Sequence, residues 1–317
     1  MDSGARQDTI FERAPSGLLV PVGLAADMWK YQSSTYAHIK GRAIELLQRF
    51  EANGLDVRRS SSIQSLARQA SELSDAWLCD EFHTVTFDHV LAMLQIDRIA
   101  TAALAVPRAN EAAFLKDLLN GSLDLLKREQ SKAKDTLWEL ELLRILTDHQ
   151  IPAELREPDI LFSLSGPALG VACKKLYSEG NVSKVVSNAV SQIERDAEFG
   201  IVALNIDDLL PADVLLKAET TEKMTKSLVD FVQDFMARHE RHFRRYLQPG
   251  RALAILASCS TIADLSAVKA RFVNARQSVA WAIPGMTPDK ERQLDEFIRA
   301  FQSQYPEETR NLAGGRA

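Results

Sequence analysis

The 317-residue sequence predicts an α/β (α+β) fold, with a mixed central sheet flanked by helices and preceded by a mainly helical region. Two patterns indicate this. Between about residues 35 and 135, apolar side chains recur every three or four positions, which is typical of helices. After residue 151, short apolar runs alternate with longer amphipathic stretches, which is typical of strands alternating with helices. We therefore expect a helical region, 1–130, and a sheet-containing region, 131–317.

The first half of the chain carries helical periodicity interrupted by turn residues. Asn53-Gly54 and Pro107 break the pattern, and Asn120-Gly121 is the expected break within the last stretch. Helices are expected over 37–50, 61–79, 85–105 and 110–146, the last as one or two helices.

The second half carries the strand signals. Strands are expected near 159–164, 169–175, 200–206, 251–257 and 277–283, and helices near 181–197, 220–247 and 288–304. Ser165-Gly166-Pro167 has the composition of a tight turn, so the first two strands should form a hairpin.

Composition limits the environment of the protein. A formal net charge of −5 gives no general attraction to nucleic acid or to an acidic membrane, although a local basic cleft remains compatible with it. The three cysteines lack C-x-x-C spacing and are expected to be reduced thiols. The chain has no signal-peptide pattern and no apolar run of about 18 residues. We expect a cytoplasmic protein that does not enter the membrane.

The stretch W-E-L-E-L-L-R-I-L, from Trp138, places a carboxylate on a helix. On a helical wheel Glu139 falls inside an apolar arc of leucines, whereas Glu141 falls on the polar side with Arg144. A core-facing glutamate is costly unless it is paired or binds a metal. Glu139 is therefore the candidate functional carboxylate and Glu141 is expected to be solvated. The alternative is that Glu139 lies at the edge of the arc and reaches water.

Asp159 follows Glu157-Pro158 at the start of an expected strand. Proline favours an extended residue before it and cannot donate to a central ladder, so Asp159 should lie at the strand start with its side chain near a cleft. The alternative interpretation of E-P-D is an ordinary turn.

The following strand, V-A-C-K-K, ends in two lysines. Alternation puts Ala172 and Lys174 on one face, and Cys173 and Lys175 on the other. An ammonium near Asp159 would suit a metal-bound water or a developing phosphorane charge. On the next helix, Gln192 lies on a largely apolar face and would hydrogen-bond toward the sheet or a backbone group; otherwise it is an ordinary polar side chain.

Taken in order, these residues resemble the PD-(D/E)xK nuclease superfamily, the restriction-endonuclease-like fold. The likeness covers residues 138–207. It implies Glu139 as the helix glutamate, Asp159 as the metal-binding aspartate, Lys174 as the motif lysine and Gln192 as the helix glutamine, all four as catalytic residues. It also implies that Mg²⁺ (or Mn²⁺) is held by Asp159 and Glu139, and that DNA, or less readily RNA, is the substrate. Relatives with an added helical region include phage-defence nucleases, an analogy from fold only.

The sequence departs from the family pattern at Ala172. If Lys174 is the motif lysine, alanine occupies the (D/E) position and cannot bind a metal. The other register pairs Cys173 with Lys175, but Mg²⁺ prefers oxygen ligands. Three interpretations follow: Glu139 or Glu157 supplies the acid, the site is inactive and the protein binds nucleic acid or a partner protein, or the alanine is engineered.

A basic run, A-R-H-E-R-H-F-R-R-Y, covers 237–246. Arg238, Arg241 and Arg245 share one helical face and would suit phosphate contacts, with Lys175 as a further candidate. The alternative is a solvated helix face. The helical region, 1–130, is a candidate surface for self-association or for a partner protein.

Overall fold

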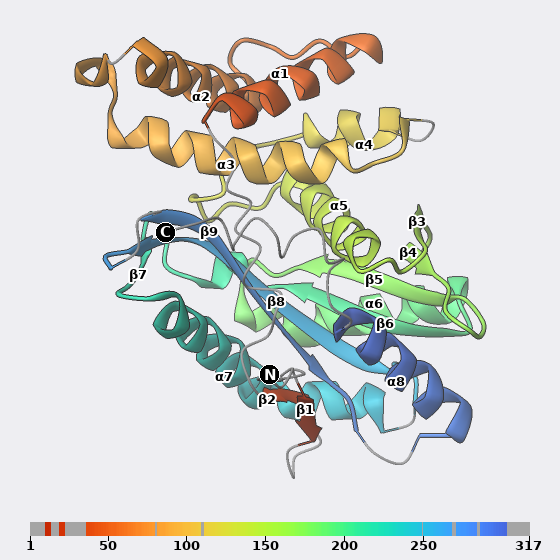
Figure 1. Ribbon diagram of the computed structural model, residues 1–317. Helices are drawn as coiled ribbons and strands as arrows, with labels where there is room; N and C mark the ends of the chain where they lie inside the picture. Colours follow the sequence, from red (N-terminus) through yellow and green to blue (C-terminus); the bar gives the residue numbers. More distant parts are fainter. Residues whose placement is uncertain are drawn as a thin grey trace, which may run out of the picture.

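The computed structural model describes residues 10–13, 19–22, 36–79, 81–108, 111–248, 250–267, 271–283 and 286–302. These residues form a mixed α/β structure with eight α-helices and a seven-stranded mixed sheet (Figure 1), which confirms the expected class. The helices are α1 (Tyr36–Ala52), α2 (Ser62–Cys79), α3 (Phe87–Leu104), α4 (Glu111–Leu118), α5 (Lys132–Asp148), α6 (Val182–Asp196), α7 (Thr221–Leu247) and α8 (Pro288–Gln302). The strands are β1 (Ile10–Arg13), β2 (Leu19–Val22), β3 (Ala153–Arg156), β4 (Asp159–Phe162), β5 (Leu169–Lys175), β6 (Phe199–Asn205), β7 (Leu216–Ala218), β8 (Ala254–Leu265) and β9 (Phe272–Trp281).

The main sheet runs in the order β3-β4-β5-β6-β8-β7, and β9 pairs with the other edge of β8. Strands β3, β4 and β5 form an antiparallel meander. Helix α6 then crosses over to β6, which is parallel to β5, and β8 is parallel to β6. Strands β1 and β2 form a separate two-stranded sheet.

Each face of the sheet is covered by its own apolar cluster. Ala172 and Val202 pack with the buried faces of α6 and α7, whereas Cys173 and Ala203 pack with Trp138 of α5 and with α8. Neighbouring residues of β5 and β6 thus enter opposite clusters, as strand alternation requires. The two faces of β5 therefore meet different helices, which decides where its terminal lysines point.

Helix α5 lies between the sheet and the helical region. Ala133, Leu137 and Leu140 belong to a cluster with α1 to α4, and Trp138 belongs to the cluster on the sheet. The indole N–H of Trp138 donates to the Ala203 carbonyl oxygen at 3.1 Å. Helices α1 to α4 form a layer above α5 and the end of the sheet (Figure 1). Helix α5 is thus packed on two sides.

Most expected elements are present, and the differences concern strands. The break at Asn120-Gly121 is confirmed, since α4 ends at Leu118 and α5 starts at Lys132. Strands β3 and β7 were not anticipated, and β8 extends to Leu265 rather than ending near residue 257. None of the described helices combines the length and apolar character needed to cross a membrane.

Candidate functional site

Asp159 opens strand β4 and is the residue at which the candidate side chains meet. It follows a two-residue turn, Glu157-Pro158, whose peptide bond is cis. The Asp159 Oδ2 atom accepts hydrogen bonds from the Cys173 backbone N–H at 2.7 Å and from the Lys174 Nζ at 2.9 Å. The aspartate side chain is 15% exposed. The structure therefore brings Asp159 and Lys174 into direct contact at the edge of the protein interior.

Strand β5 sets the direction of Lys174. Ala172 is fully buried in the cluster beneath α6, and Cys173 is buried in the cluster beneath α5. Because side chains alternate along a strand, Lys174 follows Ala172 onto the α6 face. It is partly exposed where the strand ends. Ala172 offers this face only a methyl group, so the position at which the sequence resemblance would require an acid has no ligand atom.

Helix α6 places Gln192 against the same carboxylate. Its Nε2 lies 3.1 Å from Asp159 Oδ1 and 3.2 Å from Glu157 Oε2, and it also donates to the Pro158 carbonyl oxygen. Gln192 therefore fixes both the turn and the aspartate. Glu157 itself is 70% exposed and lies 3.7 Å from Arg195, so it belongs to the rim of the site.

Glu139 belongs to α5, which packs on the other face of the sheet. It is half-buried. Burial, followed by the negative charge of Asp159, raises the pKa of Glu139 to about 8, although Lys132 and Lys174 act in the opposite direction. Near neutral pH, the chain therefore holds a protonated glutamic acid beside an aspartate.

Glu141 corrects one sequence-based expectation. We expected it to be solvated, but its side chain is 2% exposed. Arg98 Nη2 donates to Glu141 Oε2 at 2.9 Å, and Arg276 Nη2 lies 2.7 Å from Glu141 Oε1. Burial alone would raise the pKa of Glu141, but Arg276 and Arg98 outweigh it and lower that pKa. The wheel failed because α5 has protein on both sides, so its polar side faces α3 and β9.

Lys175 lies inside the protein. Its side chain is 4% exposed, and its Nζ lies 2.7 Å from Asn205 Oδ1 and 3.0 Å from Asp208 Oδ1. Both acceptors follow or end β6, the neighbour of β5. This ammonium is thus committed to internal oxygen atoms, and a phosphate outside the protein cannot reach it in this arrangement.

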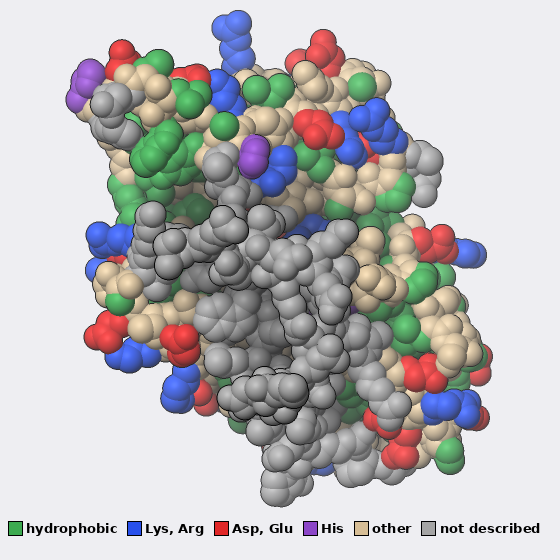
Figure 2. All heavy atoms as spheres, viewed as in Figure 1, with side chains coloured by type: hydrophobic (Ala, Val, Ile, Leu, Met, Phe, Trp, Pro, Cys, Tyr) green, Lys and Arg blue, Asp and Glu red, His purple; other side chains and the backbone are tan. Residues whose placement is uncertain are grey.

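The basic face of α7 is solvent-accessible. Arg241 and Arg245 are exposed, and Arg238 Nη2 pairs with Glu179 Oε1 at 2.7 Å. Glu179 follows the end of β5, so this ion pair links the middle of α7 to the segment after Lys174 and Lys175. On the face shown in Figure 2, basic and acidic side chains are interspersed. The sequence thus identified the exposed side of α7 correctly, while phosphate binding there stays a prediction.

Two residues near the site were not anticipated. Asp135 lies one helical turn before Glu139 on α5, and the Tyr177 hydroxyl donates to Asp135 Oδ1 at 2.8 Å. Burial raises the pKa of Asp135, against the Tyr177 hydrogen bond and the charges of Lys175, Lys132 and Lys174. The signal was present in the sequence, because residues four apart share a helix face. Asp135 therefore belongs to the same electrostatic environment as Glu139.

The donor set fits a divalent cation with few protein ligands. A carboxylate offers about four lone-pair positions, and Asp159 uses three of them for Cys173, Lys174 and Gln192. Glu139 supplies a second carboxyl group, and Mg²⁺ commonly binds through one or two carboxylates and several waters. Within the described ranges, no group of three or more His, Cys, Asp or Glu is arranged to hold a metal ion. The residues therefore fit a hydrated Mg²⁺ or Mn²⁺ and do not form a closed protein cage.

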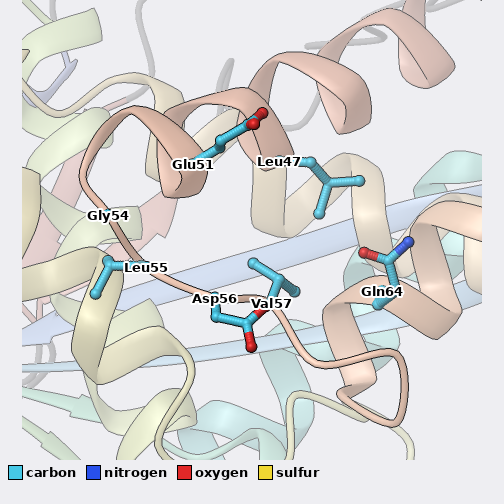
Figure 3. Close-up of a pocket in the computed structure, with 7 residues that line it drawn as sticks. All are labelled: Leu47, Glu51, Gly54, Leu55, Asp56, Val57 and Gln64. Carbon is cyan, nitrogen blue, oxygen red and sulfur yellow. The ribbon is translucent and has the colours of Figure 1, made fainter.

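A hollow lies elsewhere, in the helical region. Figure 3 shows it between the end of α1 and the start of α2, with a volume of about 410 Å³. It is lined by Leu47, Glu51, Gly54, Leu55, Asp56, Val57 and Gln64. None of the candidate residues lines it, so the hollow and the proposed chemistry are separate features.

No family model, curated protein or solved structure was found to match this chain. Its function is therefore argued from the geometry of its own residues.

Proposed function

We propose that this protein is a metal-dependent nuclease with a restriction-endonuclease-like core, hydrolysing phosphodiester bonds in DNA or, less readily, in RNA. The observation that carries the proposal is the set of contacts made by Asp159, which accepts hydrogen bonds from Lys174 and Gln192. The charge of Asp159 also raises the pKa of Glu139. The order α5, β3, β4, β5, α6, β6 supports it, because these elements carry the four residues in the sequence order of the superfamily.

Asp159 and Glu139 are the residues that would hold Mg²⁺ or Mn²⁺. When bound, such an ion acts as a Lewis acid on a phosphoryl oxygen and lowers the pKa of a bound water. The raised pKa of Glu139 supports this assignment. Burial and the charge of Asp159 make ionisation of Glu139 unfavourable, and a cation bound by both residues would offset that cost.

Lys174 and Gln192 would act from the α6 side. Lys174 Nζ, 2.9 Å from Asp159, can donate to an attacking water or to a phosphate oxygen near that carboxylate. Gln192 orients Asp159 through its Oδ1 atom and fixes the turn before β4. The aspartate thus has both oxygens held by side chains from two elements, a preorganised arrangement for binding a cation.

A second candidate is a non-catalytic subunit that uses the same core to bind nucleic acid or a partner protein. Ala172 favours it, because this buried methyl replaces the third acid of the superfamily motif. The exposed arginines of α7 favour nucleic acid as the partner. The two candidates differ in whether a phosphodiester bond is broken.

The test is cleavage of supercoiled plasmid, single-stranded DNA and RNA with Mg²⁺ or Mn²⁺. Asp159→Asn and Lys174→Gln should each lower the cleavage rate by about 100-fold or more, because each removes a charge at the reacting phosphate. Asp230→Asn and Lys226→Gln are matched controls, since these residues form an exposed pair with each other on α7. Their rates should equal that of the wild type.

The outcomes separate the two candidates. Cleavage that is lost in the site variants and kept in the controls supports the nuclease. Absence of cleavage by the wild type on all substrates contradicts it. Salt-dependent DNA binding that persists in Asp159→Asn without any cleavage supports the non-catalytic subunit.

A further inference from the structure

We propose that Arg98, supplied by α3 of the helical region, is a positioning residue for the candidate site. This inference rests on the proposed nuclease function. Arg98 touches none of the four candidate residues. Arg98 binds α5, which carries Glu139, and the segment after β6, which neighbours β5 and its Lys174. We infer that Arg98 sets the position of α5 relative to the carboxyl ends of β5 and β6.

Arg98 joins two buried carboxylates from different elements. Its Nη2 donates to Glu141 Oε2 at 2.9 Å and to Asp207 Oδ2 at 2.7 Å, and its Nε also donates to Glu141. Glu141 belongs to α5, and Asp207 lies in the segment directly after β6. A single guanidinium therefore bridges the helix of Glu139 and the sheet.

The second carboxylate connects this bridge to strand β5. Asp207 Oδ1 accepts from the Ser260 backbone N–H of β8 at 2.6 Å, and the Asp207 N–H donates to Asn205 Oδ1 at 3.2 Å. The same Asn205 oxygen accepts from Lys175 Nζ at 2.7 Å. Lys175 is the residue after Lys174, just as Glu141 is two residues after Glu139. Each end of the network therefore lies within two residues of the candidate site.

Burial makes these contacts stiff. The side chains of Glu141 and Asp207 are 2% and 7% exposed, and that of Arg98 is 12% exposed. Charges so far from water are weakly screened, and their hydrogen bonds are strongly directional. Arginine suits this role because its planar fork fixes the directions of several acceptors at once, which a lysine ammonium does not.

Glu141 also has a cationic partner on the sheet itself. Arg276 of β9 binds Glu141 at 2.7 Å and Ser260 Oγ at 2.8 Å, so Glu141 has a second cation without Arg98. Arg98 is thus not needed to neutralise Glu141. Its distinct contribution is to connect Glu141 with Asp207, that is, α5 with the carboxyl end of β6.

The experiment compares Arg98→Met and Arg98→Lys with Arg49→Met. Arg49 is the matched control because it is equally buried, at 12%, and pairs with buried Glu111 at 2.9 Å entirely within the helical region. Two quantities are measured in the full chain: the kcat and KM of Mg²⁺-dependent cleavage, and hydrogen exchange of the Trp138 indole N–H, which is bonded to Ala203 of β6.

We expect Arg98→Met to lower kcat by about 100-fold with little change in KM, because small displacements of reacting groups have effects of that size. Arg98→Lys should retain the charge and lose part of the geometry, with a loss of about tenfold. Exchange at Trp138 should be at least about tenfold faster in Arg98→Met. Arg49→Met should leave kcat and Trp138 exchange as in the wild type.

Each result decides the inference. Equal losses of kcat in Arg49→Met and Arg98→Met would show a general stability effect and overturn it, as would unchanged Trp138 exchange in Arg98→Met. If Arg98→Met does not fold, Arg98→Lys against Arg49→Met gives the same comparison. If the wild type cleaves nothing, the proposed function fails, and Trp138 exchange alone decides whether Arg98 positions α5.

Discussion

Replacing Glu139 by glutamine should change how the stability of the protein depends on pH. The folded-state pKa of about 8 lies well above the ordinary value of 4.5. A carboxyl group with a raised folded-state pKa binds its proton more tightly in the folded chain than in the unfolded chain. Its contribution to stability is therefore fully present below about pH 4.5 and is lost as the pH rises through 8. Glutamine cannot ionise, so Glu139→Gln removes this dependence.

The size of the effect follows from linkage. Between those two values, stability falls by about 1.4 kcal/mol per pH unit. From pH 5.5 to 7.5, the wild type should lose about 2.5 kcal/mol relative to Glu139→Gln, since the dependence flattens close to the folded-state pKa. The stability of the wild type relative to Glu139→Gln should thus fall steadily as the pH rises over this range.

Urea unfolding followed by fluorescence measures this difference at pH 5.5, 6.5 and 7.5 in the presence of a chelator. Glu154→Gln is the matched control, because Glu154 is 65% exposed on β3. Added Mg²⁺ should reduce the pH dependence of the wild type and leave that of Glu139→Gln unchanged. A difference between the wild type and Glu139→Gln that stays constant over this pH range would refute the assignment of Glu139 as a raised-pKa carboxyl group.

Two further predictions concern the framework of the site. Trp138→Phe should lower the free energy of unfolding by about 1–2 kcal/mol, measured by urea unfolding, because it removes the indole bond to the Ala203 carbonyl oxygen and part of a fully buried side chain; no loss would show that α5 does not depend on this bond. Gly200→Ala should cost about 1–3 kcal/mol in the same assay, because the added methyl would lie 2.6 Å from the Gly170 carbonyl oxygen and 2.5 Å from Ile193; unchanged stability would show that α6 can move away from β6.

Buried strands could be predicted from the sequence because each is a short, continuous apolar run. Strands β4, β5 and β6 lie where short apolar runs indicated them. Strand β8 was predicted too short because Ser258 and Ser260 resemble turn residues. In the structure both are buried: Ser258 accepts a hydrogen bond from the Ser278 hydroxyl at 3.0 Å, and Ser260 binds Arg276. Cross-strand polar pairs of this kind cannot be recognised from one strand alone.

Strands β3 and β7 were missed for a different reason. Strand β3 alternates half-buried and exposed residues over four positions, and β7 has only three residues. Segments this short carry little periodicity. They become strands because a longer neighbour, β4 or β8, offers them an edge.

The site itself was predictable in part. The order of motifs indicated that Asp159, Lys174 and Gln192 would be close together, and the structure places them in contact. The sequence did not reveal that the side chains of Glu141 and Lys175 are buried. Both errors have one cause: a wheel or a strand alternation tells which face a residue occupies, but not whether a second layer covers that face. Here the helical region and β9 cover it, and Arg276 and Arg98 together make burial of Glu141 tolerable.

The alanine at position 172 is best understood through the packing around it. Ala172 is fully buried, and its methyl group belongs to the apolar cluster that contains Val186 and Ala189 of α6. A carboxylate on this methyl would start in an apolar environment and would have to share Lys174 with Asp159, and burying a second carboxylate there costs free energy unless a cation compensates it. Glu139 is placed differently, on α5 at the other face of the sheet, where the charges of both Asp159 and Lys174 influence its pKa. A two-carboxylate site divided between the two faces of the sheet is therefore consistent with tight packing of α6 against β5, and the absence of an acid at 172 does not by itself argue against metal binding.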